Sequence, residues 1–168
     1  MSDEEVRYKF AESDFDLSFA KTLFLEYAES LNFDLCFQNF EEEIADLKSH
    51  YIKPGGFIIL CFLNDEPVGC VGLRIFDKDG AAEMKRLYVK PSARSKGIGK
   101  ELTVMLIEKS KELGFLKIKL DTLPSMKEAI SLYKSLGFIK IEPYRLNPHP
   151  GAVYMELKLK KLDADLTD

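Results

Sequence analysis

The residues of this chain that could bind a ligand lie around two glycines, Gly97 and Gly99. These glycines follow a strand-like segment and stand at the start of an amphipathic, helix-like segment. Glycine lets the backbone approach a ligand closely, and the first turn of a helix presents free N–H groups and roughly +0.5 of an elementary charge. Such a turn can bind a diphosphate, although a Gly-x-Gly turn alone is more often only a tight connection. The candidate binding residues are Arg94, Ser95, Lys96, Gly97, Ile98, Gly99 and Lys100.

The two best-known phosphate motifs do not fit this turn. A dinucleotide fingerprint requires a third glycine where the chain has Leu102. A P-loop requires Gly-Lys-Ser/Thr, where the chain has Gly99-Lys100-Glu101. These differences disfavour a nucleotide-binding protein and indicate a different phosphate carrier.

Two motifs in order resemble those of the GNAT superfamily of acyl-CoA N-acyltransferases. The segment from Arg94 to Gly99 is similar to the family signature Arg/Gln-x-x-Gly-x-Gly/Ala, and a strand ending Leu87-Tyr88-Val89 precedes it. Downstream, Ala129 to Phe138 is similar to the family segment Ala-x-x-x-Tyr-x-x-x-Gly-Phe. The resemblance covers residues 5–159 and is sharpest over 83–138.

The resemblance implies an N-acetyltransferase that uses acetyl-CoA, with no metal, and acetylates a primary amine of a small molecule, an amino acid or a peptide by direct attack. It also implies that Leu87, Tyr88 and Val89 contact the thioester arm of the coenzyme. One position departs from the family: Met126 stands where an asparagine often contacts the pantetheine arm. Binding at that point would depend on backbone and apolar contacts.

Glu83 is the candidate general base. A lysine-like amine with a pKa near 10.4 is mostly protonated at pH 7, so its acylation needs a proton acceptor. Glu83 has the same strand parity as Leu87 and Val89, and it matches the position where many family members place a base. The alternative is a strand carboxylate paired with nearby Lys85 or Arg86.

Tyr133 is the candidate general acid. It matches the family tyrosine that reaches the coenzyme sulfur, and a phenol can protonate a departing thiolate. Its helical spacing from Ala129 equally suits a core tyrosine with a satisfied hydroxyl.

Composition indicates one globular domain over residues 1–168, with a core at about 5–159 and a charged, frayed tail. A net charge of −4 argues against nucleic-acid binding. The absence of a long apolar run and the acidic start favour a cytoplasmic protein without a membrane span, and leave a homodimer open. Cys36, Cys61 and Cys70 have no metal-ligand spacing and are expected to be structural thiols.

The pattern along the chain predicts an α+β fold: a central mixed, mostly antiparallel sheet with helices on both faces. Strands are expected at 6–10, 57–63, 68–76, up to Val89, at 116–120 and in two segments after 138. Capping boxes at Ser13, Asn39 and Ser125 predict the starts of three helices, and a fourth follows the glycine turn. The strand-helix-strand unit around that turn implies parallel pairing.

One other interpretation remains open. A non-catalytic acyl-CoA sensor on the same fold would bind the thioester without turnover. The acceptor is expected among the first two helices and the loop 143–151, where Arg74 or Arg145 could hold a carboxylate.

Overall fold

The computed structural model describes residues 4–31, 39–53 and 55–160. These residues form two compact units. Unit 1 comprises Met1–Arg74 and Met84–Leu106, and unit 2 comprises Ile75–Glu83 and Ile107–Asp168. The expectation of a single domain stays a prediction, and Cys36 and the charged tail lie outside the described residues.

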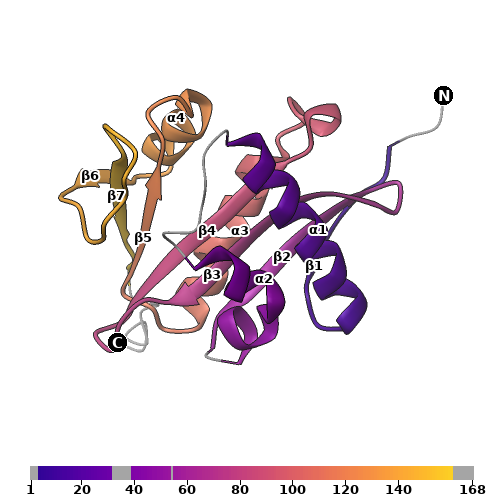
Figure 1. Ribbon diagram of the computed structural model, residues 1–168, viewed down its shortest axis with the longest axis horizontal. Helices are drawn as coiled ribbons and strands as arrows, with labels where there is room; N and C mark the ends of the chain where they lie inside the picture. Colours follow the sequence, from indigo (N-terminus) through magenta and orange to yellow (C-terminus); the bar gives the residue numbers. More distant parts are fainter. Residues whose placement is uncertain (1–3, 32–38, 54, 161–168) are drawn as a thin grey trace, which may run out of the picture. The chain divides into compact units, whose positions relative to one another are not determined.

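A seven-stranded sheet has the hydrogen-bonded order β1-β2-β3-β4-β5-β7-β6 (Figure 1). Four of its pairings, β1 with β2, β2 with β3, β5 with β7 and β6 with β7, are antiparallel. β4 and β5 are parallel, which confirms the expected strand-helix-strand unit. The strands are β1 (Val6–Phe10), β2 (Phe57–Leu63), β3 (Glu66–Ile75), β4 (Ala81–Val89), β5 (Lys117–Thr122), β6 (Ile139–Ile141) and β7 (Val153–Lys158).

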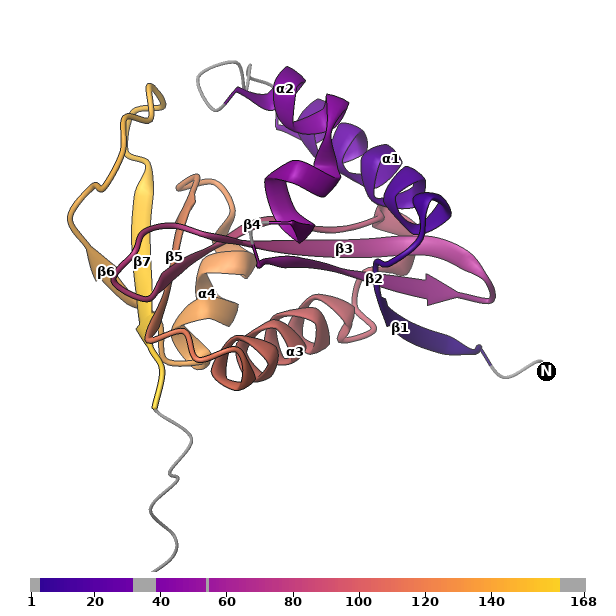
Figure 2. The ribbon, with the colours of Figure 1, turned by 90° about the horizontal axis from the view of Figure 1, so that it is seen from below.

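Unit 1 has helices on both faces of its strands, as Figure 2 shows for α1 and α2 on one side and the start of α3 on the other. Leu23 and Phe24 of α1 pack in one cluster with Ile58 and Leu60 of β2. On the opposite face, a Cβ at Gly69 would lie 3.2 Å from Ile98 of α3, so glycine makes room for that helix. The helices are α1 (Asp14–Ser30), α2 (Phe40–Ala45), a π-helical turn (Lys48–Ile52), a 3₁₀ turn (Pro91–Ala93), α3 (Ile98–Glu112) and α4 (Lys127–Ser135).

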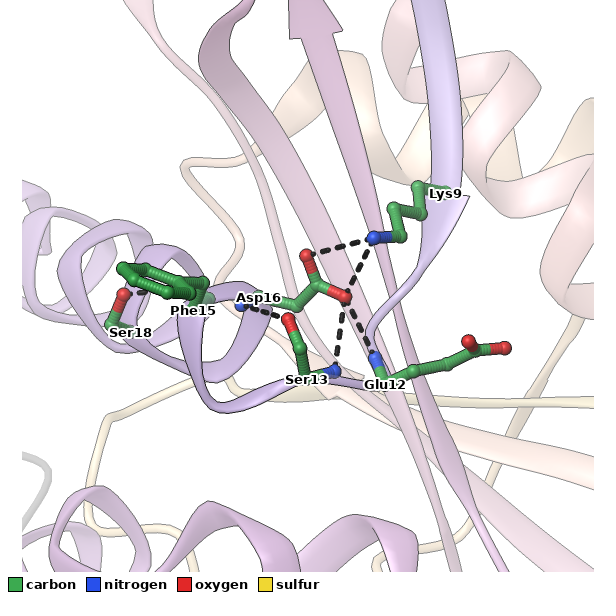
Figure 3. Close-up of polar contacts among 6 residues, drawn as sticks. All are labelled: Lys9, Glu12, Ser13, Phe15, Asp16 and Ser18. Atoms are coloured by element: carbon green, nitrogen blue, oxygen red, sulfur yellow. Dashed lines mark hydrogen bonds and ion pairs between the residues drawn. The ribbon is translucent and has the colours of Figure 1, made fainter.

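The expected capping box at the start of α1 is confirmed (Figure 3). The Ser13 hydroxyl accepts from the Asp16 N–H, and the Asp16 carboxylate accepts from the N–H groups of Ser13 and Glu12. Asp16 also receives a hydrogen bond from the Lys9 ammonium at 3.2 Å, which ties the helix start to β1.

The capping boxes expected for α2 and α4 are wrong. Asn39 adopts a left-handed conformation with φ 56° and makes no side-chain cap. α4 begins after Met126, so Ser125 lies one residue too early to cap it. In α2 the N-cap is the expected residue, but its left-handed backbone makes no side-chain cap bond. In α4 the N-cap is Met126, one residue after the expected Ser125.

The two cysteines in the described part of the chain are reduced and buried, as expected of structural thiols. The Cys70 thiol donates to the Arg86 carbonyl at 3.3 Å, and burial raises its pKa far above the ordinary value. Among the described residues, no helix is long and apolar enough to cross a membrane.

Candidate functional site

The backbone of β4 is irregular at Arg86, whose φ of 61° is unusual for a residue with a side chain. The Arg86 guanidinium bonds Glu43 of α2, and the Tyr88 hydroxyl bonds Glu26 of α1. Strand alternation from Arg86 onward therefore predicts that Leu87 and Val89 point to the opposite face.

The backbone at Arg86 bears on the expectation that Glu83 shares a face with Leu87 and Val89. That expectation assumes regular alternation from residue 83 to residue 89, and Arg86, with its positive φ, lies between them. The shared face stays a prediction.

The glycine-bearing turn after β4 forms the start of α3 in unit 1. Ser95 and Gly97 both have positive φ, 67° and 78°, so the turn adopts the left-handed region twice within three residues. The Gly97 carbonyl accepts from the Glu101 N–H at 3.0 Å, which makes it the first helical acceptor. The N–H groups of Ile98, Gly99 and Lys100 thus lie in the first turn, where a helix supplies no acceptors of its own.

The space around these glycines is open. Among residues 4–31, 39–53 and 55–160, no atom lies within 4 Å of a Cβ built on Gly97, and at Gly99 only a Val89 methyl comes near, at 3.8 Å. Gly99 also has no positive φ. The protein's own packing therefore gives no reason for glycine at 99, and close approach of a bound group would supply one. This observation fits a diphosphate.

Two of the cationic side chains near the turn already have partners within unit 1. Lys96 forms an ion pair with Glu4 at 2.6 Å, and the Arg94 guanidinium donates to the Val89 carbonyl at 3.1 Å. Both contacts are exposed, and surface pairs of this kind contribute little to stability. An incoming anion could exchange for them at small cost.

Tyr133 and Met126 belong to unit 2. The Tyr133 side chain is buried on α4 and its ring lies 5.6 Å from that of Phe138. Met126 is the N-cap residue of α4 but makes no side-chain capping bond. Its sulfur accepts a hydrogen bond from the Thr122 hydroxyl at 3.5 Å. The departure at 126 thus places a thioether between the end of β5 and the start of α4.

Glu83 is fully buried in unit 2, and two of its partners are residues that the sequence did not indicate as partners. Its carboxylate accepts from the Tyr144 hydroxyl at 2.8 Å and forms an ion pair with the Arg145 guanidinium. The Arg86 guanidinium forms an ion pair with Glu43. The partners of Glu83 come from the loop that was expected to help bind the acceptor.

Tyr144 is a site residue that the sequence did not indicate. Its ring lies 5.1 Å from Phe76 and 5.2 Å from Tyr154, and two cations, Lys119 and Arg145, lie over it at 5.2 and 5.3 Å. Burial, followed by the charge of Glu83, raises the pKa of Tyr144 far above its ordinary value. Its hydroxyl therefore stays a proton donor to Glu83 at neutral pH.

The expected site residues are divided between the two units. Residues 87–89 and 94–100 form a turn in unit 1 that can bind an anion, and Glu83, Met126 and Tyr133 belong to unit 2. Unit 2 combines a buried carboxylate, a phenol and cationic side chains, which together can exchange protons and hold charged groups.

Comparison with known proteins agrees with these features. The family model described as acetyltransferase (GNAT) family matches residues 20–138. An uncharacterized N-acetyltransferase of Schizosaccharomyces pombe is 40% identical over 149 residues, which cover 87% of this chain and 90% of the relative.

Solved structures have the same fold. A GNAT-family acetyltransferase of Staphylococcus aureus has a TM-score of 0.77 at 21% identity, covering 93% of this chain and 100% of that one. The structure of yncA from Salmonella typhimurium, described with its cofactor acetyl-CoA, has a TM-score of 0.69 at 18% identity, covering 95% and 96%.

Proposed function

This chain belongs to the acetyltransferase (GNAT) family, and on that premise we propose that it transfers an acetyl group from acetyl-CoA to a primary amine. The acceptor is the amine of a small molecule, an amino acid or a peptide. The observation that carries the proposal is the turn at the start of α3, where Gly97 has a positive φ and Gly99 borders open space.

The residues of unit 1 would hold the coenzyme. The N–H groups of the first turn of α3 bind the diphosphate, and Arg94, Lys96 and Lys100 add positive charge. After Arg86, the backbone of Leu87, Tyr88 and Val89 contacts the pantetheine arm. Bound acetyl-CoA supplies an acyl group already activated as a thioester.

Two side chains of unit 2 would move protons. Tyr133 donates its hydroxyl proton to the departing sulfur. Glu83 takes the proton of the acceptor ammonium, directly or through water, which requires its contact with Arg145 or Tyr144 to open. The apolar side chain of Met126 contacts the coenzyme arm where an amide would otherwise donate.

Two measurements on the same protein distinguish the proposed enzyme from a non-catalytic acyl-CoA sensor. Titration calorimetry with acetyl-CoA measures binding, and release of the free thiol in the presence of a panel of amines measures transfer. Binding with amine-dependent thiol release supports the enzyme. Binding without release for every amine supports the sensor, and absence of binding contradicts both. A cytoplasmic location and a homodimer stay predictions.

A further inference from the structure

We infer that the acceptor is a free α-amino acid, whose ammonium group binds the Glu83 carboxylate and whose carboxylate binds the Arg145 guanidinium. This inference rests on the proposed acetyl transfer and names the substrate class for it. It is carried by the contacts of Glu83, Tyr144 and Arg145 within unit 2.

Arg145 is the outer member of the ion pair with Glu83. Its side chain is 21% exposed, whereas that of Glu83 is 1% exposed. A ligand that approaches this pair meets the guanidinium first and reaches the carboxylate once Arg145 or Tyr144 moves. Both residues belong to a segment between β6 and β7 that has no regular secondary structure, so such a movement breaks no helix or strand.

The guanidinium of Arg145 has a donor that is not satisfied. Its Nη2 contacts Glu83, but its Nε is buried and has no hydrogen-bond partner among the described residues. Buried donors without acceptors are rare because they lose their bonds to water. A carboxylate is the planar acceptor that fits the fork of an arginine, so it could use Nε together with a terminal nitrogen.

The surrounding side chains favour a cation close to Glu83. The rings of Phe76, Tyr144 and Tyr154 lie together, and aromatic faces attract positive groups. The neighbouring charges have partners of their own: Lys119 lies 3.9 Å from Glu156, and Asp121 accepts from the Asn147 amide at 3.2 Å. A bound ligand would therefore mainly replace the contact between Glu83 and Arg145.

Charge balance distinguishes an amino acid from other amines. A plain amine that binds Glu83 in place of Arg145 leaves a partly buried guanidinium without its anion, which is unfavourable. A zwitterion replaces one ion pair by two, ammonium with Glu83 and carboxylate with Arg145. An amino acid amide or a peptide amino terminus has the ammonium without the adjacent carboxylate and resembles the plain amine.

The test is calorimetric binding of L-alanine and L-phenylalanine, and of their α-amides, to the full chain in the presence of coenzyme A. We expect each free acid to bind roughly tenfold or more tightly than its amide, the range of one charge-assisted contact. Arg145→Gln should remove this preference, and Arg145→Lys should retain part of it. Lys140→Gln, which removes one exposed positive charge from β6, is the matched control and should keep the preference.

Equal binding of acids and amides by the wild-type protein would overturn the inference, whatever the variants do. A preference that survives in a folded Arg145→Gln variant would overturn it as well. The thiol-release assay reports separately on the proposed function, because acid-selective binding without turnover contradicts acetyl transfer and leaves the binding site in place. Turnover of the amides at the same rate as the free acids would support acetyl transfer and contradict the amino-acid site.

Discussion

The Arg86 guanidinium forms two hydrogen bonds to the Glu43 carboxylate, from Nε to Oε2 and from Nη2 to Oε1, each 3.0 Å long. Both side chains are almost completely buried, and the Tyr51 hydroxyl donates a third bond to Glu43 at 3.0 Å. Arg86 is also the residue of β4 that has a positive φ. The pair therefore joins α2 to the irregular point of the strand that leads to the glycine turn.

Removing one partner of this pair should destabilise the protein strongly. Burial opposes ionisation of Glu43, but the bonds and the charge of Arg86 outweigh it and lower the Glu43 pKa. Glu43→Gln should lower the free energy of unfolding by about 3–5 kcal/mol, because a buried guanidinium loses its anion. Chemical denaturation measures this, and Glu42→Gln, at an exposed position of the same helix, should change little. Equal effects of the two variants would contradict the structural role.

Adding a side chain at Gly99 should block coenzyme binding without unfolding the protein. In the described part of the chain, a Cβ there meets only a Val89 methyl at 3.8 Å, so Gly99→Val is compatible with the fold. We expect acetyl-CoA binding by calorimetry to weaken by roughly tenfold or more, since one or two charge-assisted bonds are lost. Ser18→Val introduces a valine at an exposed position of α1 and serves as the control. Unchanged affinity in Gly99→Val would place the diphosphate elsewhere.

Tyr133→Phe should slow acetyl transfer while leaving acetyl-CoA binding largely intact. Loss of a general acid typically costs roughly 10²–10⁴-fold, and we expect a decrease of about 10- to 100-fold in kcat because water can partly replace the phenol. Tyr8→Phe removes a hydroxyl from β1 in unit 1 and should not slow turnover. Wild-type rates in Tyr133→Phe would leave Tyr133 as a core residue.

Glu83→Gln should lower turnover at neutral pH, and the rate should recover as pH rises. Without a base, the reaction depends on the small fraction of acceptor that is already neutral, and this fraction grows as the pH rises toward the pKa of the acceptor amine. The pH dependence of kcat/KM measures the effect, with Glu128→Gln, an exposed residue of α4, as the control. A profile identical to that of the wild type would exclude Glu83 as the base.

The Asp16 cap predicts a pH-dependent stability. Burial opposes its ionisation, but the N–H groups of Glu12 and Ser13 and the Lys9 ammonium lower its pKa below the ordinary 3.8. The stabilisation is thus present above that value and is lost as pH falls through the lower pKa of the folded state. Asp16→Asn should cost about 0.5–2 kcal/mol at pH 7 and much less in acid. Asp14→Asn, at an exposed position of the same first turn, should show a smaller difference in stability between pH 7 and acid. A loss of stability in Asp16→Asn that does not depend on pH would refute the linkage.

Features that depend on neighbours in sequence could be predicted well. The helix that follows the glycine turn and the α1 capping box each depend on a few consecutive residues. The parallel pairing of β4 with β5 followed from the helix between them. Prediction from local spacing failed for the capping boxes at Asn39 and Ser125. The three-residue spacing is necessary for such a cap, but it does not determine the backbone conformation.

Sequence alone determined that a strand, a glycine turn and a helix succeed one another near residue 97, because short-range sterics and helix geometry fix that arrangement. Tertiary structure decided the partners of the charged groups. Glu83 pairs across 61 and 62 residues with Tyr144 and Arg145, and Arg86 pairs across 43 residues with Glu43. Buried charges take whichever opposite charge the folded chain brings to them, and no local pattern encodes that choice.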